Sequence, residues 1–77
     1  MTKRRSLFRP RNYVSGNLKV ELHEPNMGHY VLYITHAAYP RAYRHTFSNQ
    51  DSAIAVFNFV TANDDLALYL LSYINGR

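Results

Sequence analysis

The chain has 77 residues, of which 47% are hydrophobic, contains no cysteine and carries a formal net charge of +4. This length suits one domain with a small core, and the lack of cysteine excludes disulfides, thiolate metal sites and a cysteine nucleophile, which predicts a reducing, cytoplasmic setting. No stretch approaches the roughly 20 apolar residues of a membrane span, and no apolar signal-peptide segment follows the basic N-terminus.

The positive charge is concentrated at the N-terminus, where residues 1–12 carry +5 while the rest of the chain nets −1. We therefore expect a flexible basic arm over residues 1–12, followed by a single domain over residues 13–77. Arginine and lysine side chains neutralise phosphates, so a nucleic-acid or phosphate-binding role is predicted for the basic residues of the arm and one strand cation. These residues are Lys3, Arg4, Arg5, Arg9, Arg11 and Lys19.

Two other interpretations of the arm stay open. A short basic terminus also serves simply as a solvated, solubilising tail. Leu7 and Phe8 form an apolar pair inside the charged run, and such a pair favours a segment that docks on its own domain or on a partner. In that case Phe8 is the expected anchor.

Three strands are expected after the arm. Residues 15–17 indicate a turn, and Leu18, Val20 and Leu22 then alternate with polar residues over 18–23, the period of a half-buried strand. Turn residues at 24–28 precede a β-branched and aromatic run over 30–36. Residues 37–41 end that run, and 42–47 form a third strand.

Two helices are expected after the strands. Ser48 as N-cap with Asp51 three residues later approximates a capping box, and an apolar stripe follows at helical spacing, with Phe59 behind it. The stripe consists of Ala53, Val56, Phe57 and Val60. Asn63 or Asp64 restarts the pattern and Asn75-Gly76 ends it.

The second helix is apolar on nearly all sides, which indicates either burial on two sides or binding. One face is expected to hold Leu66, Tyr69, Leu70, Tyr73 and Ile74, with Leu68 and Leu71 pointing elsewhere. Leu68, Leu71 and Phe59 suggest a homodimer joined through this helix. Residues 67–74 also fit a short buried strand, because periodicity alone does not separate the two.

The expected fold is therefore α+β, a three-stranded antiparallel meander with one or two C-terminal helices packed on one face, in the order β-β-β-α-α. The helices are expected to cover Leu18, Val20, Leu22, Leu32, Ile34 and Phe47. The opposite face then presents a mixed set of side chains with Tyr33 between Lys19 and Arg44. One tyrosine is a small platform for stacked bases, and no ribonucleoprotein motif is present.

The segment from Tyr39 to Arg44 is the most interface-like stretch, because tyrosine and arginine are enriched at binding hot spots and a proline lowers the ordering cost of association. The predicted partner-binding residues are Tyr39, Arg41, Tyr43, Arg44 and Tyr33. The alternative is a proline-containing turn whose tyrosines pack over the sheet edge.

The sequence contains no recognisable metal-binding or catalytic motif. The four histidines, His23, His29, His36 and His45, lack diagnostic metal spacing, although a tight hairpin would bring His36 opposite His45. The serines lack a G-x-S-x-G context, and no glycine-rich phosphate loop occurs. We therefore expect no metal, no cofactor and no enzyme activity.

A small, cysteine-free chain with this strand-then-helix order resembles the single-domain inhibitors encoded by phages and other mobile elements, such as anti-CRISPR proteins. The resemblance rests on size and expected architecture, so it transfers no site residues. It implies action by occupying a surface, often that of a nuclease or nucleoprotein complex. The leading hypothesis is thus a protein-binding inhibitor or adaptor, and the alternative is a DNA- or RNA-binding protein.

Overall fold

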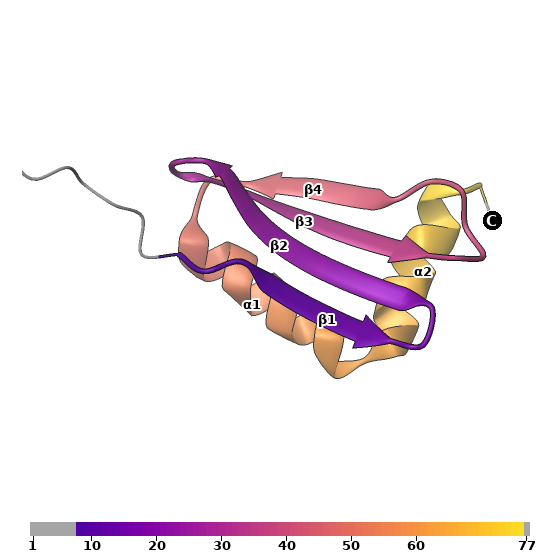
Figure 1. Ribbon diagram of the computed structural model, residues 1–77. Helices are drawn as coiled ribbons and strands as arrows, with labels where there is room; N and C mark the ends of the chain where they lie inside the picture. Colours follow the sequence, from indigo (N-terminus) through magenta and orange to yellow (C-terminus); the bar gives the residue numbers. More distant parts are fainter. Residues whose placement is uncertain (1–7, 77) are drawn as a thin grey trace, which may run out of the picture.

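The computed structural model describes residues 8–76, which form a four-stranded antiparallel sheet in the order β1-β2-β3-β4 with two helices on one face (Figure 1). The α+β class and the two C-terminal helices are confirmed, but the sheet has four strands, whereas the sequence predicted three. The elements are β1 Arg11–Ser15, β2 Leu18–Asn26, β3 His29–His36, β4 Tyr43–Phe47, α1 Gln50–Ala62 and α2 Asp64–Ile74.

The additional strand is β1, which pairs with β2 from Arg11 opposite Leu22 to Ser15 opposite Leu18. The predicted boundary after Asn12 therefore falls inside β1, and the end of the predicted arm belongs to the folded domain. Phe8 is also buried in the core, where its ring lies 5.2 Å from that of Tyr30. The remainder of the predicted arm, residues 1–7, lies outside the described residues.

The hairpin between β1 and β2 depends on a glycine. Gly16 has a φ of +60°, and the two residues between Ser15 and Leu18 form the whole connection. Two-residue hairpin loops require positive φ at one or both central positions, which glycine adopts without steric cost. β2 runs longer than predicted, to Asn26, and its pairing with β3 shifts register between His23 and Asn26.

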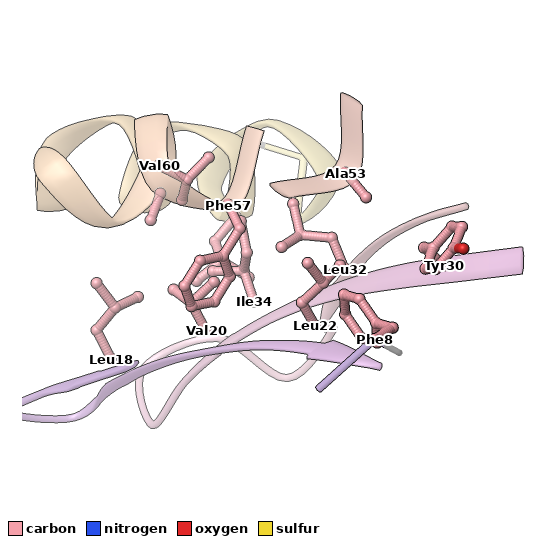
Figure 2. Packing of buried hydrophobic residues seen from close by; sticks show 12 residues of the cluster. Phe8, Leu18, Val20, Leu22, Tyr30, Leu32, Ile34, Ala53, Phe57 and Val60 are labelled. Carbon is pink, nitrogen blue, oxygen red and sulfur yellow. The ribbon is translucent and has the colours of Figure 1, made fainter. Parts of the chain in front are cut away.

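The core lies between the sheet and the helices, as Figure 2 shows. Alternate residues of β2 and β3 point to the helices, so the period-two pattern predicted their side correctly. Phe57 and Val60 of α1 pack against this layer from above, and Phe8 closes it beside Leu22 and Tyr30. The fully buried strand residues are Val20, Leu22, Leu32 and Ile34.

α1 starts one residue later than predicted. Asn49, and not Ser48, is the N-cap, because its side-chain oxygen accepts a 2.9 Å hydrogen bond from the backbone N–H of Ser52. Asn63 then ends α1 and also caps α2, where its side chain accepts a 3.0 Å bond from the N–H of Asp65. One extended residue therefore joins two helices that are bent by 104°.

The segment 64–74 is a helix, which settles the strand alternative, but its buried side differs from expectation. Ala67 and Leu71 are fully buried, whereas Tyr69 and Tyr73 are 63% and 70% exposed. Of the three residues that suggested a homodimer through this helix, Leu71 packs inside the core of its own chain, Leu68 packs against that core and Phe59 is 69% exposed. The small side chain of Ala67 allows α2 to approach the sheet closely.

The two helices contact different parts of the sheet: α1 packs on β2, β3 and β4, and α2 packs on β3 and β4. Neither helix alone is long and apolar enough to cross a membrane among the described residues, although the bent pair together meets that test by length and composition.

Candidate binding surfaces

The predicted partner-binding residues do not form one surface. The cross-strand register places Arg44 opposite Tyr33 on the face of the sheet that the helices leave open. Tyr43 lies opposite Ile34, on the helix side, and is partly buried against the core. The five predicted residues are therefore divided between the two faces of the sheet and the loop that precedes β4.

Tyr39 belongs to the loop between β3 and β4 and is packed against the core. Its backbone N–H donates a 3.0 Å bond to the carbonyl of His36, and its ring lies 6.0 Å from the His36 ring in an edge-to-face arrangement. This agrees with the alternative interpretation of the segment, a proline-containing turn whose tyrosines pack over the sheet.

Arg41 ties the same loop to the end of α2. Its backbone N–H donates to Asn75 Oδ1 at 3.1 Å, and Asn75 Nδ2 donates to its carbonyl at 3.0 Å. The guanidinium also donates to the carbonyl of Ile74 at 3.4 Å, so its charge meets the negative end of the helix dipole. Arg41 thus has a structural role, which nothing in the sequence pattern indicated.

The open face of the sheet is nearly balanced in charge. Lys19, which was predicted to bind phosphate, forms a 2.8 Å ion pair with Glu21, and His23 Nε2 lies 2.8 Å from the same carboxylate. The hydrogen bonds from Lys19 and then His23 lower the pKa of Glu21. The ring of His23 also packs edge-to-face on Tyr33, with centroids 5.8 Å apart.

The remaining predicted phosphate-binding residues lie at the N-terminal end. Arg9 and Arg11 are exposed, and Arg11 is the first residue of β1. Lys3, Arg4 and Arg5 lie outside the described residues. Among the described residues, the most basic stretch of sequence is therefore 9–11, which leads into β1.

Asp64 occupies a well-defined polar contact between α2 and β1. Its Oδ1 accepts a 2.8 Å bond from the Tyr13 hydroxyl, and its Oδ2 accepts a 2.6 Å bond from Ser15 Oγ. The bonds from Ser15 and then Tyr13 lower the pKa of Asp64, and the bond to Asp64 raises the pKa of Tyr13. Both carboxylate oxygens are thus engaged in holding β1 on the helix layer.

No group of three or more histidine or acidic side chains within residues 8–76 is arranged to hold a metal ion. The suggested His36–His45 pairing is wrong, because His45 lies opposite Leu32 and His36 lies opposite Leu18. A pocket of about 510 Å³ lies between the β3–β4 loop and the end of α2. Its lining residues are Ala38, Tyr39, Pro40, Ser72 and Asn75.

The outward side of α2 is absent from the predicted site residues, although the apolar pattern on nearly all sides of this helix indicated burial or binding. We define the outer face of α2 as Asp65, Tyr69 and Tyr73, flanked by Leu66 and Leu70; the first three are exposed and the two leucines are half-buried. Ala67 and Leu71, four residues apart, lie on the opposite side of the helix, which is buried.

Charge is separated between the layers of the molecule. The helices hold Asp51, Asp64 and Asp65 and no lysine, arginine or histidine. The cations of the described chain lie in the strands and loops: Arg9, Arg11, Lys19, Arg41 and Arg44. The helix layer is therefore acidic, although the whole chain is basic.

Comparisons with protein-family models, with curated proteins and with solved structures each find no match for this chain.

Proposed function

We propose that this chain is a small, non-enzymatic binding protein that inhibits or adapts a protein or nucleoprotein partner by covering part of its surface, in the cytoplasm. The observation that carries the proposal is the exposure of Tyr69 and Tyr73 on one side of α2, at 63% and 70%. Residues four apart on a helix are neighbours, so the two rings lie on the same side of α2.

These tyrosines have no part in holding the fold together. Ala67, Leu71 and the partly buried aliphatic residues of α2 make its contact with the core. Neither tyrosine takes part in that contact or makes a side-chain hydrogen bond to another described residue. Exposed aromatic surface is costly in water, and tyrosine is among the residues most enriched at binding hot spots. The chain has no cysteine and only five acidic residues. Two of these acids, Asp64 and Glu21, have structural partners, which supports a binding role over catalysis.

Affinity capture from nuclease-treated lysate, followed by reconstitution with the purified partner, tests the proposal. Tyr69→Ala with Tyr73→Ala is expected to weaken the complex at least about tenfold, as for hot-spot residues. Tyr33→Ala with Arg44→Ala changes the open sheet face instead and serves as the control. A protein partner that binds the first double variant as tightly as the unchanged chain contradicts the assignment to α2.

Nucleic-acid binding is the second candidate, supported by the exposed Arg9 and Arg11 beside a segment that contains Lys3, Arg4 and Arg5. Fluorescence anisotropy with labelled DNA and RNA tests it. Affinity is expected to fall steeply between roughly 50 and 200 mM salt, and to collapse when Lys3, Arg4 and Arg5 become glutamine. Binding that does not change with salt concentration, or no binding at all, rules this function out.

A further inference from the structure

We propose that the outer face of α2 recognises arginine side chains on the surface of a protein partner, with each tyrosine ring stacking on a guanidinium and Asp65 pairing with the one beside Tyr69. This inference rests on the proposed function and adds the chemistry of the partner. It begins with spacing: Asp65, Tyr69 and Tyr73 follow one another at intervals of four residues, which places them along one side of the helix over about 12 Å.

The carboxylate of Asp65 is available for a partner. Its backbone N–H is held by Asn63 at 3.0 Å, but the side chain makes no hydrogen bond or ion pair with another described residue. Its neighbour Asp64 is the opposite case, since Tyr13 and Ser15 occupy both carboxylate oxygens. Of these two adjacent acids, one is therefore built into the fold and the other faces solvent.

The helices provide no cation that would compete for this carboxylate. α1 and α2 carry three aspartates and no basic residue, and the cation of the described chain that contacts α2 is Arg41, whose guanidinium is bound to the carbonyl of Ile74 at the other end of the helix. Tyr69 lies one turn beyond Asp65 and Tyr73 one turn further, and the faces of tyrosine rings attract cations. The N-terminal part of this surface is thus complementary in charge to a positively charged, flat group.

Arginine fits this surface better than lysine. Its planar guanidinium stacks on an aromatic ring and at the same time presents paired N–H donors to a carboxylate, whereas the lysine ammonium is a strongly hydrated point charge. Proteins that handle nucleic acid carry arginine on the surfaces that contact phosphate. The preferred occupant is accordingly an arginine-bearing segment of such a partner.

α1 supplies a matched comparison within the same chain. Asp51 and Asp65 each lie two positions after the N-cap of their helix and are both exposed. The residues four and eight positions after Asp51 are Ala55 and Phe59, where α2 has two tyrosines. Asp51 therefore shares the charge and the helix position of Asp65 but lacks the pair of adjacent rings.

The test is an NMR titration of the full chain with a short synthetic peptide that contains two arginines, beside peptides with lysine or citrulline in their place. The arginine peptide is expected to shift the ring signals of Tyr69 and Tyr73 and to bind at least about threefold more tightly than the lysine peptide. The citrulline peptide, which keeps the shape and loses the charge, is expected to leave these signals unchanged.

Variants locate the binding. Asp65→Asn is expected to weaken the arginine peptide about threefold, as for an exposed ion pair, and Asp51→Asn to leave it unchanged. Tyr69→Ala with Tyr73→Ala is expected to abolish the ring-dependent preference for arginine. Equal binding of the arginine and lysine peptides, or equal losses from the two aspartate variants, overturns the inference in favour of unspecific attraction.

The competing occupant of the outer face of α2 is the basic arm of a second copy of this chain. Sedimentation of the full chain and of the variant with Lys3, Arg4 and Arg5 changed to glutamine distinguishes it. Monomers in both cases, with unchanged peptide affinity, support a separate partner. A dimer that dissociates in this variant and in the double tyrosine variant assigns the face to a second copy and overturns the proposal. If a captured partner needs Tyr69 and Tyr73 while the peptides show no preference for arginine, only this inference fails.

Discussion

Tyr13, in the first strand, donates a hydrogen bond of 2.8 Å to Asp64, the first residue of α2, across 51 positions of sequence. Ser15 completes the contact on the other carboxylate oxygen. β1 is an edge strand that pairs with β2 alone, so this contact joins the least supported strand to the helix layer. Its loss is expected to loosen β1 first.

Asp64→Ala is accordingly expected to lower the Tm by several degrees, because it leaves two hydroxyls without their acceptor at once. Tyr13→Phe removes one bond and is expected to have a smaller effect in the same direction. Thermal unfolding followed by circular dichroism gives both values, with Tyr69→Phe as the control for loss of an exposed hydroxyl. Equal Tm values for Asp64→Ala and the unchanged chain contradict a structural role for this contact.

Acid is expected to destabilise the protein through the same carboxylate. Because the folded state lowers the pKa of Asp64, its ionised form stabilises the fold near neutral pH. That contribution is lost as pH falls from about 4 through the folded-state pKa. Glu21, whose pKa is lowered in the same direction, contributes over the same range.

Denaturant unfolding between neutral pH and about pH 3 tests this dependence. The combination of Tyr13→Phe and Ser15→Ala is expected to reduce the loss of stability in acid, since Asp64 then titrates nearer its unfolded pKa. Glu21→Gln removes the other contribution and keeps that of Asp64. If both variants lose as much stability in acid as the unchanged chain does, other groups determine the pH dependence of stability.

Phe8→Ala is expected to lower the free energy of unfolding by about 2–4 kcal/mol, since the ring is buried beside Tyr30 at the edge of the core. Arg9→Ala, at the exposed neighbouring position, is expected to change it by less than about 0.5 kcal/mol. Urea denaturation measures both. Similar values for the two variants place the ring of Phe8 outside the core.

Leu71→Ala and Tyr69→Ala separate the two sides of α2. Leu71 is fully buried, and its truncation is expected to cost about 2–5 kcal/mol, whereas Tyr69→Ala is expected to cost less than about 1 kcal/mol. The reverse order of these two values, measured by urea denaturation, means that the tyrosine side of α2 faces the core.

Gly16→Ala is expected to cost about 1–2 kcal/mol, because a φ of +60° is unfavourable for an L-residue. No heavy atom lies within 4 Å of the position that a Cβ would occupy, so the cost is conformational and not steric. Chemical synthesis with D-alanine at position 16 tests the distinction. The D-residue is expected to restore or increase stability, and a loss equal to that of L-alanine refutes a backbone origin.

The sequence predicted the parts of the fold that periodicity controls. Val20 and Leu22 on one strand, and Phe57 and Val60 on α1, face the core as their spacing indicated. β1 was missed because its five residues include one β-branched side chain and adjoin a run of arginines, which together look like a disordered tail. Its pairing with β2 and its contact with Asp64 are long-range interactions that no local pattern carries.

The binding surfaces were harder to predict, for a related reason. On a helix as apolar as α2, several stripes fit the helical period equally well, and only close packing selects the one with Ala67 and Leu71. The loop with Tyr39 and Arg41 looked like an interface by composition, but its hydrogen bonds to Asn75 and His36 were not visible in the sequence.

Asn63 is the single residue at which the chain changes direction between the two helices, and Ala67 and Leu71 in the core hold α2 in the new direction. The φ of −145° and ψ of 103° at Asn63 set the direction in which α2 leaves α1, while the spacing of Tyr69 and Tyr73 is fixed by the helix itself. Because hydrogen bonds fix both ends of α2, at Asp64 and at Asn75, the two rings are presented to solvent from a helix that is anchored at each end.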